Sequence, residues 1–344
     1  MRVTQRATTE LATALLAQRG SPPTHAALQA TVLVEAELRG VPSHGLQRLP
    51  RLLRRIENGV VDAATLGTGR WRSSGVYEVD GKAGLGPVVA IHALRHIVER
   101  ASTTGIAVAA IRNSNHLGML AYYVEQIAAS GQIGIVTSSS EALVHPFNGT
   151  RAMLGTNPLA IAVPTAGRPL VIDLATSVVS MGKIHHHAAN DLPIPLGWAR
   201  DAEGRPTADA TLAKHGSIAP FGEAKGYCLG IALELLIAAL AGSALAPDVK
   251  GTLDADEPCN KGDVIIAIQP ASVPDLLEKL KAYLDLVRAS PAADPATPVS
   301  VPGDGAASRR SAALEAGFEI SASLWAELNS LRNLNSPAVE GQTQ

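Results

Sequence analysis

A serine, a histidine and an arginine stand close together in the segment VPSHGLQR, as Ser43, His44 and Arg48. An imidazole can give or take a proton near neutral pH, and a guanidinium can bind a carboxylate through two parallel hydrogen bonds. One helical turn separates the two, so Arg48 could hold a small acid while His44 faces its reacting carbon. The spacing alone favours a simpler interpretation, in which Ser43 caps the next helix and His44 is merely exposed.

A second polar segment, NSNHLG, contains His116 and lies between an expected buried strand and an expected helix. α/β proteins often place ligand-binding groups in such loops, and the free amides at a helix start suit a phosphate. A turn that uses asparagine for left-handed backbone is an equally good interpretation.

Three further segments carry candidate binding residues: LGTNP with Thr156, DLATS with Asp173 and PFGEAKG with Lys225. Thr156 offers hydrogen bonds in a tight turn, and an acid at the end of a strand, such as Asp173, can accept ribose hydroxyls. Lys225 opens an apolar helix, where a cation suits a phosphate or a ribose. A plain turn, a helix cap and a loop lysine remain the alternatives for the three.

Several common sites are absent from the sequence. It contains no G-x-G-x-x-G, no phosphate-binding G-x-x-x-x-G-K-[ST], no G-x-S-x-G and no H-E-x-x-H. The three consecutive histidines at 185–187 point in different directions on any regular element, so they do not form a helical zinc site. We therefore predict no metal site and no ordinary dinucleotide fingerprint.

The composition narrows the class of protein. Of 344 residues, 29 are Lys or Arg and 31 are Asp or Glu, a formal net charge of −2 that favours neither nucleic acid nor an anionic membrane. The chain is 46% hydrophobic and 17% charged, which excludes a largely disordered protein. Two cysteines, Cys228 and Cys259, cannot build a disulfide framework, and we expect a cytoplasmic protein.

The elements expected to position these residues change in character along the chain. Residues 1–70 are predicted to form an N-terminal helical region that carries the SHG turn, and residues 71–288 a central α/β region. Residues 289–308 are predicted to form an extended linker, and the C-terminal part of 289–344 to contain a helix. The polar stretch 190–220 is expected to be a surface excursion. The strands are predicted at 76–80, 106–112, 133–137, 159–164, 170–173 and 263–269, and the helices at 4–19, 24–39, 49–58, 86–100, 118–130, 273–287 and 323–331.

The segment Tyr227–Pro247 is apolar over nearly the length of a membrane span. Glu234 stands in its middle, and a charge at the centre of a spanning helix costs about 2.5–3.5 kcal/mol. We therefore expect a buried core helix and no membrane association.

In this order, the segments resemble the malate/L-lactate dehydrogenase family of the non-Rossmann type, which includes malate, sulfolactate and ureidoglycolate dehydrogenases, diketogulonate reductase and piperideine- and pyrroline-2-carboxylate reductases. The resemblance covers about residues 5–330. The matching text is SHGLQRLPRLLRRIENGVV at 43–61, VDGKAGLGPVVA at 79–90, AAIRNSNHLGMLAYY at 109–123, LGTNPLAIAVP at 154–164, IDLATSVVSMGKI at 172–184, PFGEAKGY at 220–227, and VKGT with CNKGDVIIAI at 249–268.

The resemblance implies an α/β fold that binds NAD(P) without a Rossmann domain, on a mixed or antiparallel sheet with surrounding helices. Residues 71–288 would bind cofactor and substrate, and the C-terminal helix within 289–344 would pack back on the N-terminal helical region. The protein would be a homodimer. The reaction would be hydride transfer between NAD(P)H and a carbon beside a carboxylate, with malate, lactate or sulfolactate as the type of substrate.

The resemblance also assigns roles. His44 matches the acid/base, Ser43 assists it, His116 matches a second histidine with a possible role in proton transfer, Arg48 matches the carboxylate ligand and Thr156 a substrate contact. The positions that match cofactor contacts are His116, Leu117, Gly118, Met119, Leu120, Ser140, Asp173, Leu174, Ala175, Lys225, Gly303 and Asp304.

Other functions stay open at this point. A cyclic-imine reductase acting on Δ1-pyrroline-2-carboxylate or Δ1-piperideine-2-carboxylate is the main alternative, although Lys183 stands where such members tend to carry an acid. A hydrolase that uses Ser43 and His44 is disfavoured, since adjacent residues rarely form a nucleophile–base pair. A ligand-binding relative without catalysis would be expected to lack His44, Arg48 or Lys225, and all three are present.

Overall fold

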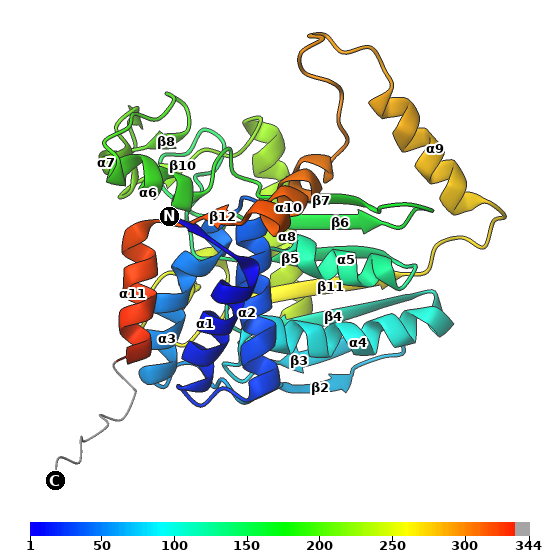
Figure 1. Ribbon diagram of the computed structural model, residues 1–344, viewed down its shortest axis with the longest axis horizontal. Helices are drawn as coiled ribbons and strands as arrows, with labels where there is room; N and C mark the ends of the chain where they lie inside the picture. The colour runs from blue at the N-terminus through cyan, green and yellow to red at the C-terminus, as the bar shows by residue number, and fades with distance from the viewer. Residues whose placement is uncertain (334–344) are drawn as a thin grey trace.

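A seven-stranded sheet forms the centre of the computed structural model, which describes residues 1–333. Its strand order is β2-β3-β4-β11-β5-β6-β7, and only β3 and β4 run parallel (Figure 1). The strands are β2 (Thr68–Trp71), β3 (Val76–Asp80), β4 (Ile106–Arg112), β5 (Ile133–Ser138), β6 (Leu159–Val163), β7 (Leu170–Leu174) and β11 (Gly262–Ile268). The predicted mixed, largely antiparallel sheet is confirmed, and β2 was missed because TGRW lacks apolar alternation.

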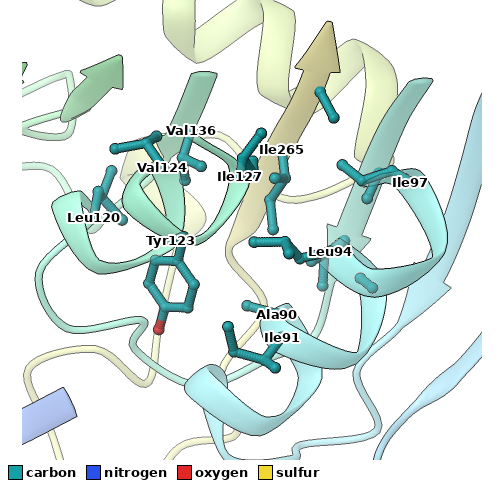
Figure 2. Close-up of a cluster of buried hydrophobic side chains, with 14 of the residues drawn as sticks. Ala90, Ile91, Leu94, Ile97, Leu120, Tyr123, Val124, Ile127, Val136 and Ile265 are labelled. Atoms are coloured by element: carbon teal, nitrogen blue, oxygen red, sulfur yellow. The ribbon is translucent and has the colours of Figure 1, made fainter. Parts of the chain in front are cut away.

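The central strand β11 is covered on both faces. Ile265 and Ala267 join the core formed with α4 (Gly86–Thr104) and α5 (Ala121–Ala129), where Tyr123, Val124 and Ile127 pack (Figure 2). Gly262 points the opposite way, because a Cβ there would meet Ile237 of α8 (Ala224–Ala241). The period of two along the strand thus assigns α4 and α5 to one face and α8 to the other.

Helix α8 is less buried than its sequence predicts. Ile237 and Glu234 face the interior, whereas Leu235 is 55% exposed and Leu236 43%. By length and composition alone this helix could cross a membrane, yet only 33% of it is buried in the protein. The expectation of a buried core helix is therefore wrong for this chain on its own, since one apolar face is exposed.

The N-terminal helices form a second hydrophobic cluster that includes residues from the C-terminal part of the chain, Phe318, Ile320 and Leu328. Arg39 at the end of α2 pairs with Glu35 and with Glu125 of α5, and Arg310 pairs with the same Glu35. These pairs fasten the helical layer to the sheet. The elements involved are β1 (Arg2–Val3), α1 (Gln5–Ala17), α2 (Pro23–Leu38), the 3-10 turns η1 (Pro42–His44) and η2 (Leu46–Arg48), α3 (Leu49–Glu57), α10 (Asp304–Ala316), β12 (Phe318–Glu319) and α11 (Ala322–Asn333).

The polar stretch at 190–220 is folded rather than irregular. It contains a three-stranded sheet, order β10-β8-β9, and packs against α6 through an apolar cluster that includes Ile184, Ile194 and Ile218. The sequence analysis did not predict these elements, because they are short and the segment contains many prolines. The elements of this part are α6 (Met181–Ala189), β8 (Ala199–Arg200), β9 (Pro206–Thr207), α7 (Ala210–Ala213) and β10 (Ser217–Ile218), and η3 (Ala246–Asp248) follows α8.

The segment between β11 and α10 projects from the body. Its helix α9 (Leu276–Arg288) has no buried residue and stands well apart from the sheet (Figure 1). The predicted linker ends early, because α10 already begins at Asp304. The division of the chain at residues 70 and 288 stays a prediction, and residues 334–344 of its last part lie outside the described residues.

Candidate active site

Ser43 and His44 lie in the turn η1, directly after α2. The Ser43 hydroxyl is 2.9 Å from Nδ1 of His44, and neither η2 nor α3 has a side-chain cap. The simpler interpretation of Ser43 as a helix cap is therefore wrong. Its hydroxyl fixes the imidazole by one ring nitrogen and leaves the other, Nε2, for a ligand.

The glycine of the SHG turn is required by a buried carboxylate. Oε1 of Glu37 accepts the Leu46 amide at 2.7 Å and lies so close to Gly45 that a Cβ there would overlap it. Burial raises the pKa of Glu37 to about 7. This contact fixes the backbone conformation of the turn between His44 and Arg48.

Arg48 is oriented by the backbone of the same turn. Its Nε donates to the Ser43 carbonyl at 2.7 Å, and its two terminal nitrogens have no protein partner among residues 1–333. Burial, and next the charge of Arg51, lower the pKa of Arg48 to about 10, so the side chain stays charged at neutral pH. The free edge of the guanidinium suits a carboxylate.

His116 faces His44, with the two ring centroids 5.5 Å apart. The Gly118 amide donates to Nδ1 of His116 at 2.8 Å. Because an amide can only donate, Nδ1 is unprotonated and the neutral ring carries its hydrogen on Nε2. Burial, and then Arg48 and His44, hold the pKa of His116 well below its usual range. His116 is thus built to donate a hydrogen bond.

His44 is also neutral in the free protein. Burial lowers its pKa to about 3, and the charge of Arg48 acts in the same direction. A bound carboxylate would offset that charge and raise the pKa again, which is the condition for His44 to carry a proton.

The segments LGTNP, DLATS and PFGEAKG meet at one place. The Thr156 amide donates to Oγ of Ser140 at 3.1 Å, and the Thr156 carbonyl accepts from the amide of Thr176 at 2.8 Å. The Phe221 amide in turn donates to the Thr176 carbonyl at 3.0 Å. Backbone hydrogen bonds therefore bring Ser140 and Thr156 beside the start of α8, which carries Lys225.

Asp173 joins the end of β7 to the loop that contains His116. Its Oδ2 accepts the Ala121 amide at 2.7 Å, and the recessed position of the carboxylate raises its pKa to about 6. Within the loop, the side chains of Leu117, Met119 and Leu120 are buried. A ligand would therefore meet this loop through its backbone, and it would meet the exposed Leu174 directly.

Lys225 and Gly303 complete the cofactor candidates. Lys225 is exposed in the first turn of α8 and has no ion pair within the described part of the chain. Gly303 has φ +93° and lies against Val171 of β7, two residues from Asp173. Asp304 accepts hydrogen bonds from Arg168 at 2.6 Å and Arg288 at 2.9 Å, so its carboxylate fastens Gly303 in place.

These donors and acceptors fit a dinucleotide. Asp173 can accept hydrogen bonds from ribose hydroxyls, and Lys225 can pair with a phosphate. Because Gly303 has no side chain, a ligand can come close to the backbone at this position. Asp173 and Gly303 lie at one sheet edge, and Ala175 follows directly after β7. Of these candidates, Asp173 is the one that contacts the end of the His116–Leu120 loop, through the Ala121 amide.

Two residues that line or support the candidate site were not singled out by the sequence analysis. Glu234 was treated only as a charge that opposes membrane insertion, and Arg51 lay in the helix expected at 49–58 without a role of its own. In the structure Arg51 lines a pocket together with Arg48 and His116. The spacing of three residues between Arg48 and Arg51 was the available signal.

Comparison with known proteins finds relatives over most of the chain. The family model described as malate/L-lactate dehydrogenase matches residues 3–329. The crystal structure of a dehydrogenase from Sinorhizobium meliloti is 55% identical, with a TM-score of 0.94 over 96% of this chain and 98% of that one. A (2R)-3-sulfolactate dehydrogenase (NADP(+)) of Chromohalobacter salexigens is 36% identical over 275 residues, 79% of this chain and 82% of the relative. A Delta(1)-pyrroline-2-carboxylate reductase 2 of Burkholderia multivorans is 36% identical over 266 residues, 76% and 77% of the two chains.

Fold, site and relatives together define an NAD(P)-dependent oxidoreductase. The chain belongs to the malate/L-lactate dehydrogenase family. This result decides against the hydrolase and the non-catalytic binder.

Proposed function

We propose that the protein transfers a hydride between NAD(P)H and a small 2-hydroxy or 2-oxo acid of malate, lactate or sulfolactate type. One observation carries this proposal. Hydrogen bonds to Ser43 use Nε of Arg48 and Nδ1 of His44, so the terminal nitrogens of Arg48 and Nε2 of His44 are left to contact a substrate. The relative named as a sulfolactate dehydrogenase supports the substrate type.

In the reductive direction, Arg48 binds the carboxylate of the oxo acid and fixes which face of the carbonyl is presented. Nε2 of His44 gives its proton to the carbonyl oxygen while the carbon gains the hydride, so the product is the hydroxy acid. Nε2–H of His116 donates a hydrogen bond to the developing alkoxide. Oxidation reverses these steps, and the neutral His44 then removes the hydroxyl proton.

The bound nicotinamide supplies or accepts the hydride. We propose that Asp173 holds its ribose and Lys225 its phosphate. The remaining contacts are assigned to the loop His116–Leu120, to Leu174, Ala175 and Ser140, and to Gly303 as positioned by Asp304. Thr156, fastened to Ser140, is assigned to the substrate.

A cyclic-imine reductase is the second candidate, favoured by the pyrroline-2-carboxylate reductase among the relatives. Gly182 lies against Ser43, since a Cβ there would be 3.0 Å from Cβ of Ser43, so the next residue, Lys183, is close to the site. Its Nζ lies 5.1 Å from the centre of the Trp198 ring. A cation at this position favours the hydroxy-acid reaction, because an iminium substrate would be repelled.

The test is the loss of reduced-nicotinamide absorbance with NADH and with NADPH, measured in parallel. Oxaloacetate, pyruvate, sulfopyruvate, Δ1-pyrroline-2-carboxylate and Δ1-piperideine-2-carboxylate are supplied in turn. Fast oxidation with a straight-chain oxo acid is the expected result and would also identify the preferred cofactor. Fast oxidation with the cyclic imines alone would replace the proposal by the second candidate.

We further propose that the protein is a homodimer. Tyr283 and Leu286 of α9 are 64% and 70% exposed, and Leu235 and Leu236 of α8 are exposed as well. Exposed apolar side chains on two helices are typical of an interface between subunits. The mass in solution, measured by light scattering, should be that of two chains. Leu286→Glu combined with Tyr283→Glu should give monomers, and the control Lys279→Glu on the same helix should stay dimeric.

A cytoplasmic location is proposed on the cysteine chemistry. Cys228 and Cys259 are both free, and thiols are kept reduced in the cytosol. Recovery of the activity in the soluble cell fraction, with no loss under reducing conditions, would be the expected result.

A further inference from the structure

We propose that Arg51 binds a second anionic group of the substrate, so that the enzyme prefers 2-oxo acids whose C3 carries a carboxylate or sulfonate. This inference rests on the proposed function, because it takes Arg48 as the ligand of the first carboxylate. It narrows the substrate class from small 2-oxo acids in general to dianions.

The first step is the arrangement of three arginines on one side of a helix. Arg48, Arg51 and Arg55 follow each other at spacings of three and four residues through η2 and α3, and all three line one pocket. His116 and Thr252 line the same pocket. The pocket therefore opens directly onto the group that we assign to the reaction.

The second step is which of these charges is already used. Arg55 donates to Oδ1 of Asn115 at 3.0 Å and to the backbone carbonyl and Oδ1 of Asp254 at 3.0 and 3.4 Å. Arg51 forms no hydrogen bond and no ion pair with any residue between 1 and 333, and it is exposed to solvent. Of the three, Arg48 and Arg51 can bind a ligand.

The third step is the charge around the pocket. The positive charge of Arg51 helps to lower the pKa of Arg48, His116 and His185, although burial is the larger cause for each. Both site histidines are neutral, so two uncompensated positive charges face the pocket. The nearby acid Glu141 already accepts hydrogen bonds from Thr252 and Leu253. A substrate with one negative charge would neutralise only one of Arg48 and Arg51, whereas a substrate with two negative charges would neutralise both.

The fourth step is the spacing. Residues three apart on a helix surface have Cβ atoms about 5–6 Å apart, and two guanidinium groups so placed can reach both acidic groups of a four-carbon diacid. A methyl group in place of the second anion, as in pyruvate, would leave Arg51 without a partner. A cofactor phosphate is the competing ligand, yet Asp173, Lys225 and Gly303 do not line this pocket.

The experiment compares oxaloacetate with pyruvate for the wild-type protein, Arg51→Met and the control Arg54→Met. Arg54 is exposed on the same helix and does not line the pocket. We expect the wild type to prefer oxaloacetate, and Arg51→Met to lower kcat/KM for oxaloacetate about 100-fold, chiefly through KM. The fall with pyruvate should be at least about tenfold smaller. Arg54→Met should behave as wild type, and Arg51→Lys should recover part of the loss.

Binding without turnover separates this inference from the proposed function. Calorimetry with NAD+ present measures the affinity for L-malate and for L-lactate in the same proteins, and Arg51→Met should lose the preference for malate. Equal losses with both substrates, a wild type that prefers pyruvate, or a change in cofactor affinity alone would overturn the role of Arg51 while the proposed function stands. A wild type that reduces only cyclic imines would instead overturn the proposed function, and malate binding would then decide on Arg51 by itself.

Discussion

Glu234, in the middle of the most apolar helix, accepts a hydrogen bond from Nδ2 of Asn157 at 2.7 Å. The same carboxylate accepts the amides of Gly155 at 3.2 Å and Ala246 at 2.7 Å. A buried carboxyl group in α8 therefore fixes the turn that carries Thr156. The residue that argues against a membrane span in the sequence is a structural support of the site.

Replacing Glu234 by Leu should destabilise the protein by about 2–4 kcal/mol, because three buried donors lose their acceptor. Glu234→Gln keeps one oxygen and should lose less. Urea unfolding of both variants measures the difference, with the exposed Glu10→Gln as control. If Glu234→Leu unfolded at the wild-type urea concentration, this support would be unimportant.

His44→Ala should nearly abolish turnover, because His44 is the group assigned to exchange a proton with the substrate oxygen, whereas His116 is assigned a hydrogen bond to it. A loss of about 10²–10⁴-fold in kcat is expected for a general acid/base. Binding of NAD(P)H, followed by quenching of tryptophan fluorescence, should persist. Substantial turnover in this variant would remove His44 from its assigned role.

The pH dependence should differ between the two directions. Burial and Arg48 lower the pKa of His44 to about 3, so above that pH the protonated form is a minor fraction of the free enzyme that falls about tenfold per pH unit. Because kcat/KM reports the free enzyme, its value for oxo-acid reduction should fall about tenfold per pH unit between pH 5 and 8. Its value for hydroxy-acid oxidation should stay level over the same range, since the neutral imidazole is the base. A break near pH 6.5 in either profile would contradict this assignment.

Lys225→Met should weaken cofactor binding about tenfold, the effect of one exposed ion contact with a phosphate, and raising the salt concentration should shrink the difference. The dissociation constant for NADPH, measured by fluorescence titration, is the direct readout. Lys214→Met on α7 is a matched control. Unchanged binding in Lys225→Met would move the phosphate site elsewhere.

The sequence predicted the long elements well, because strands such as Ile106–Arg112 and helices such as Gly86–Thr104 have clear apolar patterns. It failed where a pattern depends on distant partners. The strand at Thr68–Trp71 is recognisable only from its pairing with β3. The helix at Asp304–Ala316 is held by the ion pairs Arg310–Glu35 and Arg168–Asp304 rather than by an apolar face.

The same contrast holds for the site. His44, Arg48, His116 and Asp173 stood out because their residue types fit the chemistry. The orientation of His116 could not be predicted, since it depends on the amide of Gly118. Likewise, nothing in the sequence separates the paired Arg55 from the free Arg51, because Asp254 is 199 residues away.

The loop between His116 and Leu120 contributes Leu117 and Leu120 to the main core, which also contains Tyr123 (Figure 2). The hydroxyl of Tyr123 donates a hydrogen bond to the carbonyl of Leu117. One wall of the site is therefore continuous with the hydrophobic core around β5 and β11. The amides of this loop should exchange with deuterium as slowly as those of the central strands, because the loop cannot open without disrupting the core.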